Sequence, residues 1–359
     1  MSVEKPPARD LSYENIENGY LRLRTKPSAR MAYSFIPSAT THPRRPEPLL
    51  VFLSGVDNAK HVWQRTLNKM FEFACAISIE LPPMLFYDRF GTGQSDPDPT
   101  DAGKQPEDYH DANDAVADLY QLILQVVQDK YHQKGASPHV LPPIVFCAHS
   151  FGVCLARIFS ATYPGVVEGL MILDSAIATI PAEKFFPNPD DPASWKSRKD
   201  GTSVWSRNGF PADGFSEDIC RDAIQKIRSS PISGYAMASN ERIRWDNMPR
   251  LLPYNDKPKL QGPTPSLPLV TVINNDPDVV GPNLARTLKI PEPLIRYACL
   301  PIFRDYASKL HHIQPKGEGK TIIAHGAGHM IHVDCPELVA RELIELIANS
   351  SQIVEKSRI

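Results

Sequence analysis

The sequence predicts an α/β fold with a mainly parallel sheet that helices cover on both faces. Short runs of almost purely apolar residues recur along the chain. Such runs are typical of strands buried on both sides, and they lie at 49–53, 84–87, 144–147, 169–174 and 267–273. Stretches with helical apolar spacing separate them, for example 116–127, where the apolar residues fall on one face of a helix. Because strands alternate with helices, we expect a parallel sheet.

The two ends of the chain add the remaining elements of this core. Residues 1–18 are polar and rich in proline, so we expect a poorly ordered lead-in. The segments 20–24 and 31–36 have strand-like composition and predict a hairpin. Towards the other end, 321–324 predicts the last strand and 336–348 predicts a closing helix.

The alternation of strands and helices is interrupted between residues 176 and 263. This segment holds ten prolines and many aromatic residues, and two pieces of it have helical spacing, 217–229 and about 237–246. We therefore expect a core built from two parts, 19–175 and 264–359, with 176–263 as an insertion between them.

Composition and charge exclude several classes of function. With 359 residues and a net charge of −2, the chain can bury a large core and lacks the basic excess that binds nucleic acid. No apolar stretch reaches the roughly 18–20 residues of a membrane-spanning helix, and the first residues lack the apolar core of a secretory signal. The six cysteines have no paired spacing, so we expect reduced thiols in an intracellular protein, without a disulfide framework or zinc site.

The segment 144–160 carries the strongest chemical signal. A buried strand leads into a sharp turn at Ser150, and helical spacing begins directly after the turn. A serine between two small residues, here Ala148 and Gly152, in a strand–turn–helix is the context of a nucleophile elbow. Such a turn would expose the serine hydroxyl, and the start of the helix would aim the N–H of Phe151 at an oxyanion.

Four motifs together resemble the α/β-hydrolase superfamily. They are the loop after an apolar strand, a glycine-rich loop, the elbow and a histidine-containing segment, at 49–58, 87–95, 148–152 and 321–337. Their order and spacing resemble that family, and their joint occurrence is far more specific than any one of them. The resemblance implies the α/β-hydrolase fold, with a helical cap inserted after the strand that ends at Asp174.

The resemblance also implies a Ser-His-Asp triad with Ser150 as the nucleophile. A serine hydroxyl is a weak nucleophile until a base takes its proton, and the base needs an orienting acid. His329 follows the last strand, where the family's catalytic histidine is found, and this position favours it over His325 and His332 as the base.

The acid of the triad is expected from the loop after the strand 267–273, which offers Asp276 and Asp278. The residues after Asp278 resemble those after the family's acid, because an apolar pair and then a proline follow in both. Asp276 precedes a proline, which suits a turn-opening or capping role and leaves it as the alternative acid. Asp174 is a substitute that some relatives use.

The family's oxyanion hole uses two backbone N–H donors. They correspond here to Phe151 and to Val56, which follows Ser54 and Gly55 where many relatives carry His-Gly. Because Ser54 replaces that histidine, the sequence does not show how the side chains of this loop are hydrogen-bonded. The backbone N–H of Val56 is expected all the same. For His149, beside the nucleophile, we expect a structural role.

The resemblance therefore implies a serine hydrolase that cleaves an ester, thioester or lactone of a small to medium apolar substrate through an acyl-enzyme on Ser150. No metal or organic cofactor is implied. A serine nucleophile disfavours epoxide hydrolase and haloalkane dehalogenase chemistry, which needs an alkyl-enzyme ester. The alternatives are C–C bond hydrolysis, acyl transfer in a biosynthetic pathway, or a non-hydrolytic ligand-binding member of the fold.

The last three residues bear on location. Ser357-Arg358-Ile359 resembles a conservative variant of the peroxisomal address Ser-Lys-Leu. The expected location is therefore the cytoplasm or the peroxisome.

Overall fold

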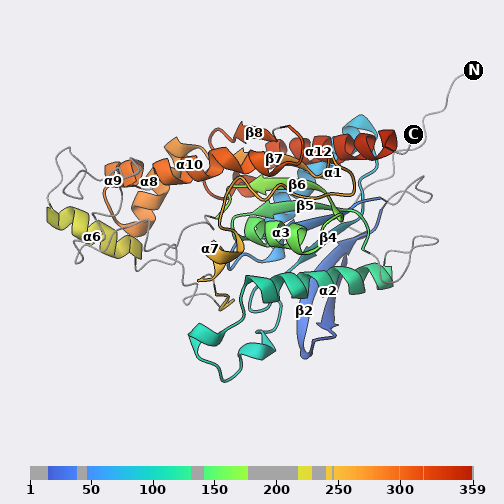
Figure 1. Ribbon diagram of the computed structural model, residues 1–359, viewed down its shortest axis with the longest axis horizontal. Helices are drawn as coiled ribbons and strands as arrows, with labels where there is room; N and C mark the ends of the chain where they lie inside the picture. Colours follow the sequence, from blue (N-terminus) through green and yellow to red (C-terminus); the bar gives the residue numbers. More distant parts are fainter. Residues whose placement is uncertain are drawn as a thin grey trace, which may run out of the picture.

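The computed structural model describes residues 15–38, 47–130, 141–176, 217–228, 240–244, 246–298, 300–317 and 319–357. In this part of the chain, one eight-stranded sheet forms the centre of the molecule (Figure 1). The strands lie in the order β1-β2-β4-β3-β5-β6-β7-β8. Their bounds are β1 Glu17–Leu23, β2 Lys26–Ile36, β3 Leu49–Leu53, β4 Met84–Tyr87, β5 Ile144–His149, β6 Val167–Leu173, β7 Leu269–Asn274 and β8 Lys320–Ile323.

The predicted hairpin and parallel sheet are confirmed. Strands β1 and β2 pair antiparallel, and β2 pairs antiparallel with β4. From β4 to β8 every pairing is parallel. Because parallel strands have their carboxyl ends at one edge, the residues that follow β3, β5, β6, β7 and β8 meet at that edge, where ligands bind in open α/β sheets.

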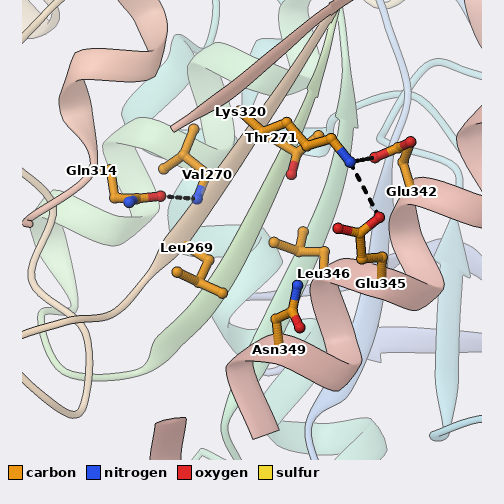
Figure 2. A pocket seen from close by; sticks show the side chains of 9 residues that line it. All are labelled: Leu269, Val270, Thr271, Gln314, Lys320, Glu342, Glu345, Leu346 and Asn349. Carbon is orange, nitrogen blue, oxygen red and sulfur yellow. Dashed lines mark hydrogen bonds and ion pairs between the residues drawn. The ribbon is translucent and has the colours of Figure 1, made fainter. Parts of the chain in front are cut away.

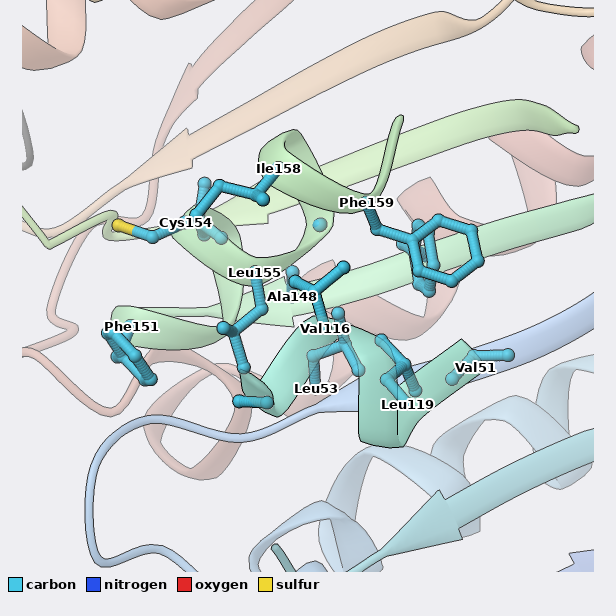
Figure 3. Packing of buried hydrophobic residues seen from close by; sticks show 14 of the residues in the cluster. Val51, Leu53, Val116, Leu119, Ala148, Phe151, Cys154, Leu155, Ile158 and Phe159 are labelled. Carbon is cyan, nitrogen blue, oxygen red and sulfur yellow. The ribbon is translucent and has the colours of Figure 1, made fainter. Parts of the chain in front are cut away.

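Helices cover both faces of the sheet, as predicted. Alternate residues of one strand pack on opposite faces: Val51 and Leu53 belong to one buried cluster, and Leu50 and Phe52 to the other. The first cluster includes α2 (Ala112–Lys130) and α3 (Phe151–Thr162), and the second includes α1 (Gln64–Ile77) and α12 (Pro336–Lys356). Figure 3 shows side chains of α3 lying against α2 and β3.

The closing helix is longer than predicted, and several helices precede the last strand. Helix α12 continues beyond the expected 336–348 to Lys356, and Val339 and Leu343 on it are fully buried. The region between β7 and β8 is helical, with bounds α8 Pro277–Leu288, α9 Glu292–Ala298, α10 Leu300–Leu310 and η7 His311–Ile313. The remaining short elements are η2 Lys60–Trp63, η3 Pro99–Asp101, η4 Pro106–Asp108, α7 Met248–Leu251 and α11 Ile331–Asp334.

The insertion 176–263 lies largely outside the described residues, as do most of its aromatic side chains. Helix α6 (Glu217–Arg228) matches the first expected helix of this segment. The prediction of a second helix at about 237–246 is wrong for the residues of this range that the structure describes. Residues 240–244 form turns and a bridge, because the Arg244 N–H binds the carbonyl of His110 and the local chain follows that neighbour.

The structure bears on the cysteines and on membrane-spanning helices among the described residues. Cys75, Cys147, Cys154 and Cys335 are free thiols, and Cys147 and Cys154 are buried. Among the helices described, none combines the length and the hydropathy needed to cross a bilayer.

Candidate active site

Ser150 stands between β5 and α3 in a backbone conformation that few residues adopt. Its φ and ψ are 52° and −118°, a strained region that tends to occur at functional sites. The Ser150 N–H binds the carbonyl of Leu173 at 3.0 Å, which ties the turn to β6. A Cβ on Gly152 would lie 2.3 Å from the carbonyl oxygen of Leu53, so only glycine lets α3 pack this closely on β3. These features are typical of a nucleophile elbow.

His329 reaches Ser150 from the loop after β8. Its Nε2 lies 3.1 Å from the Ser150 Oγ, although 179 residues separate the two in sequence. Half of the His329 side chain is exposed (50%), so the ring stands at the edge of the core and is accessible from outside. The structure thus brings together the predicted nucleophile and the predicted base.

Asp174 lies on the other side of the His329 ring. Its Oδ2 is 2.5 Å from His329 Nδ1, and only 17% of the Asp174 side chain is exposed. Asp174 follows β6 directly and has a φ of 40°. The Nδ2 of Asn275, which follows β7, lies 2.8 Å from both carboxylate oxygens and fixes the orientation of the carboxylate.

The hydrogen bonds determine which nitrogen of the His329 ring carries the proton. A carboxylate only accepts hydrogen bonds, so Nδ1 carries the hydrogen that it donates to Asp174. In the neutral ring Nε2 then has a lone pair directed at the Ser150 hydroxyl. Loss of water around the ring lowers the pKa of His329, but the hydrogen bond and charge of Asp174 outweigh this effect and raise the pKa above its ordinary value.

The structure does not bring Asp278 to His329, and this corrects the expectation from the sequence. Helix α8 begins at Pro277, with only two residues between it and the end of β7, so Asp278 lies in its first turn. The Asp278 side chain is 82% exposed and pairs with Arg296 at 3.0 Å. Asp174, the substitute weighed from the sequence, occupies the position beside His329 instead.

Asp276, the alternative acid, has the capping role that its proline neighbour suggested. Its carboxylate accepts the N–H of Asp278 at 2.9 Å and caps α8. The same carboxylate accepts the N–H of Gly326 at 2.9 Å. These backbone hydrogen bonds lower the pKa of Asp276. Asp276 therefore ties the start of α8 to the loop that carries His329.

The loop of residues 54–57, which we call the oxyanion loop, follows β3 and lies against the elbow. A Cβ on Gly55 would be 3.1 Å from the Ser150 Cβ. The Trp63 Nε1–H donates to the Ser54 Oγ at 2.9 Å, which shows how the serine in place of histidine is held. Val56 follows Gly55 in this loop, and Phe151 follows Ser150. Both expected oxyanion donors therefore belong to segments beside Ser150.

Two further histidines lie behind the His329 ring. His149 is fully buried, and its Nε2 lies 2.9 Å from the carbonyl oxygen of His329, to which it donates. Burial, with the neighbouring His329 and His332, holds the pKa of His149 well below its usual range, so its ring is neutral. His332 is also fully buried, and it stacks on Trp63 with ring centroids 4.3 Å apart. Through its hydrogen bond, His149 holds the backbone of His329.

Three polar residues near the site were not predicted from the sequence. Asn275 orients Asp174, and Arg89 and Glu241 form a buried ion pair behind the oxyanion loop. Arg89 comes two residues after the apolar strand β4, and a charged residue in that place could have indicated a buried partner. Asn275 and Glu241 lie in segments with no pattern that sets them apart.

The cavity drawn in Figure 2 is separate from this site. It has a volume of about 190 Å³ and lies beside the amino ends of β7 and β8, where Lys320 pairs with Glu342 and Glu345. The amino ends of parallel strands are at the edge of the sheet opposite to Ser150, so this cavity is no candidate for the substrate pocket. In the part of the chain that the structure covers, no group of three or more His, Cys, Asp or Glu residues is placed to hold a metal ion.

Comparison with known proteins bears on the fold. No curated protein sequence matches the chain. Among solved structures, the chain is similar to a membrane phospholipase A described as a bacterial virulence factor, with 15% identity, coverage of 94% of this chain and 87% of that one, and a TM-score of 0.50. It is also similar to VrEH2, with 12% identity, coverage of 94% and 99%, and a TM-score of 0.53. The epoxide hydrolase VrEH1 from Vigna radiata has 13% identity, the same coverage, and a TM-score of 0.49.

At these identities the likeness shows the fold alone. A family model described as the alpha/beta hydrolase family, however, matches residues 30–342, which is most of the sequence. The chain belongs to the alpha/beta hydrolase family.

Proposed function

We propose that the protein is a serine hydrolase that cleaves an ester, thioester or lactone of a small to medium apolar substrate. One observation carries the proposal. The Ser150 Oγ, the His329 ring and the Asp174 carboxylate form a continuous line of contacts, 3.1 Å and 2.5 Å long. Acyl transfer through a serine requires a nucleophile, a base and an orienting acid that contact one another in this order.

In the first half of the reaction, the Ser150 oxygen attacks the carbonyl carbon of the substrate, and its proton passes to His329 Nε2. Asp174 stabilises the imidazolium that forms, and the backbone N–H groups of Val56 and Phe151 stabilise the oxyanion. His329 then gives the proton to the leaving alcohol or thiol, and the bond to the carbonyl carbon breaks. The product of this half is an acyl ester of Ser150.

In the second half, His329 takes a proton from a water molecule that attacks the acyl ester. The tetrahedral intermediate collapses, Ser150 recovers its proton from His329, and the carboxylic acid leaves. The role proposed for Asp174 replaces the one expected for Asp278, because Asp278 pairs with Arg296 on the surface. We further propose that the segment 176–263 forms a cap over this site.

The experiment that tests the function is a panel of p-nitrophenyl esters with acyl chains of increasing length. We expect turnover by the wild-type protein, with a preference for one range of chain lengths, and no turnover above background by Ser150→Ala of the same thermal stability. Equal activity of the two proteins would refute the proposal. Absence of turnover and of covalent labelling in the wild type would favour a ligand-binding member of the fold.

We propose that the protein is located in the cytoplasm or the peroxisome. A fluorescent protein that carries the last ten residues of the chain tests the resemblance of Ser357-Arg358-Ile359 to a peroxisomal address. Punctate signal that overlaps a peroxisomal marker would support the address, and diffuse signal would exclude it.

A further inference from the structure

Two charged side chains are buried together behind the oxyanion loop. Arg89 follows β4, and Glu241 comes from the far end of the insertion. Only 6% of the Arg89 side chain and none of the Glu241 side chain is exposed. Burial of two charges is costly unless each finds an opposite charge and hydrogen-bond partners. The contacts of this pair therefore indicate what it holds in place.

Arg89 uses its planar guanidinium to hold the carbonyl groups of the oxyanion loop. Nη1 donates to the carbonyl oxygen of Ser54 at 2.7 Å, and Nη2 donates to the carbonyl oxygen of Gly55 at 2.6 Å. Nη2 also donates to Glu241 Oε2 at 3.1 Å, and Nε donates to Glu241 Oε1. A rigid fork of donors can satisfy all of these acceptors at once, which a lysine ammonium cannot.

The hydrogen bond to Gly55 also fixes the orientation of the next N–H group. The carbonyl of Gly55 and the N–H of Val56 belong to one planar peptide group. The two cis peptide bonds of the described chain are elsewhere, before Pro258 and Pro268. In a trans peptide the C=O and the N–H point in opposite directions. When Arg89 holds the Gly55 oxygen, the Val56 N–H therefore points away from Arg89.

Glu241 holds the peptide group on the other side of Val56. Its Oε2 accepts the N–H of Asp57 at 3.1 Å. Asp57 has a φ of 56°, which residues other than glycine seldom adopt without support. The two peptide groups that flank Val56 are thus each tied to one member of the ion pair.

The same ion pair contacts the second expected donor segment and the glycine-rich loop. The guanidinium carbon of Arg89 lies 5.5 Å from the centre of the Phe151 ring. A Cβ on Gly91 would lie 2.4 Å from the carbonyl oxygen of Asn240 and 2.8 Å from the Cα of Glu241. The glycine at 91 therefore allows the 240–241 backbone to dock closely enough for Glu241 to reach Arg89.

We infer that Arg89 and Glu241 are positioning residues that aim the Val56 N–H at the oxygen of the reacting carbonyl. The inference rests on the proposed function, because it assigns a task within that reaction. An oxyanion donor acts mainly on the transition state, so its misplacement should lower kcat and leave KM nearly unchanged. The docking of residues 240–241 would then be a condition for full activity.

The test uses Arg89→Lys and Glu241→Gln in the full-length protein, with p-nitrophenyl butyrate as substrate. We expect kcat to fall by about 10²–10³, the range reported for loss of one oxyanion donor, with KM changed by less than about threefold. The inhibition constant of an alkyl trifluoromethyl ketone, which forms a tetrahedral adduct, should rise in parallel with the loss of kcat. Binding of the corresponding methyl ketone should be little affected.

Asp118→Asn is the matched control. Asp118 is also buried and lies on α2, but its carboxylate accepts a hydrogen bond from Lys26, at 2.6 Å, and not from the oxyanion loop. We expect this variant to lose thermal stability and to retain kcat within about twofold, because no donor group depends on it. If a single variant does not fold, the double variant Arg89→Met/Glu241→Met removes both charges together, which a buried site tolerates better. It should show the same loss of kcat.

The outcomes separate this inference from the proposed function. Wild-type kcat in folded Arg89→Lys, Glu241→Gln or the double variant would overturn the inference and leave the serine hydrolase intact. A rise in KM without loss of kcat would also overturn it, since that result indicates substrate binding. Failure of the proposed function would appear in the wild-type protein itself, as absence of ester turnover.

Discussion

His329 and Asp174 are joined by a 2.5 Å hydrogen bond, although 155 residues separate them in the sequence. This bond fixes the hydrogen on Nδ1 and leaves Nε2 to face Ser150. Asn275 then holds the Asp174 carboxylate through both of its oxygens. The proposed acid is thus supported by the loop after β7, which supplies an amide where the sequence suggested an aspartate.

The first prediction concerns the identity of the acid. Asp174→Asn should lower kcat by about 10⁴ with little change in KM, because the amide favours the wrong tautomer of His329. Asp278→Asn should retain most of the activity, since Asp278 contacts Arg296 and not the histidine. Steady-state kinetics on a p-nitrophenyl ester compare the two variants. An inactive Asp278→Asn beside an active Asp174→Asn would place the acid at 278.

The second prediction concerns pH. His329 must be neutral to accept the serine proton, and its pKa is raised above the ordinary value of 6.5 by Asp174 against the opposing effect of desolvation. The ratio kcat/KM should therefore fall as the pH decreases through a midpoint above 6.5. Residual activity of Asp174→Asn should show a lower midpoint, because the negative charge is lost. Identical midpoints in pH–rate profiles of the two proteins would contradict this assignment.

The third prediction concerns the packing of the elbow. Gly152→Ala should destabilise the protein by about 1–3 kcal/mol, as overpacking does, because the new methyl group meets the Leu53 carbonyl at 2.3 Å. Gly281→Ala in α8 is the matched control, since its nearest neighbour would be 3.5 Å away. That change should be neutral or stabilising by up to about 1 kcal/mol. Urea unfolding measures both, and equal effects would show that the close contact is unimportant.

The fourth prediction concerns acid stability. Burial, and then the charge of His329, lowers the pKa of His332 to about 3, and among the described residues neither ring nitrogen has a hydrogen-bond partner. The unfolded chain binds a proton at this ring near its ordinary pKa of 6.5, so folding stability should fall as the pH decreases from 6.5 towards 3. The slope for one such group is about 1.4 kcal/mol per pH unit.

His332→Phe should reduce this slope, because phenylalanine can stack on Trp63 without taking up a proton. Ile77→Gln, at an exposed position, is the control and should leave the slope unchanged, because neither side chain takes up a proton. Urea unfolding at several pH values between 7 and 4 gives the comparison. Equal slopes in wild type and His332→Phe would mean that another group controls acid unfolding.

Much of the fold could be predicted from the sequence because its signals are local. The buried strands are uninterrupted apolar runs, and the elbow at Ser150 is a strand, a turn and a helix in consecutive residues. His329 could be chosen because it follows the last strand at the place familiar from the family. Each of these features depends on a few neighbouring residues and not on distant contacts.

The acid and the support of the oxyanion loop depend on contacts between distant segments. Asp174, Asp276 and Asp278 all follow buried strands, and the sequence does not show that α8 begins at Pro277 and turns Asp278 outward. Glu241 lies 152 residues from Arg89 and falls in a stretch whose spacing suggested a helix. Local periodicity cannot reveal such a pair, because the partner that determines the conformation of residues 240–244 is far away in the sequence.

The central claim is that Ser150 forms a covalent bond with the reacting acyl group. The most direct test is to label the wild-type protein with a fluorophosphonate probe and to locate the adduct by tandem mass spectrometry of the peptides. We expect one adduct, on Ser150, and none in folded Ser150→Ala. An adduct on another residue, or undiminished labelling of Ser150→Ala, would contradict it.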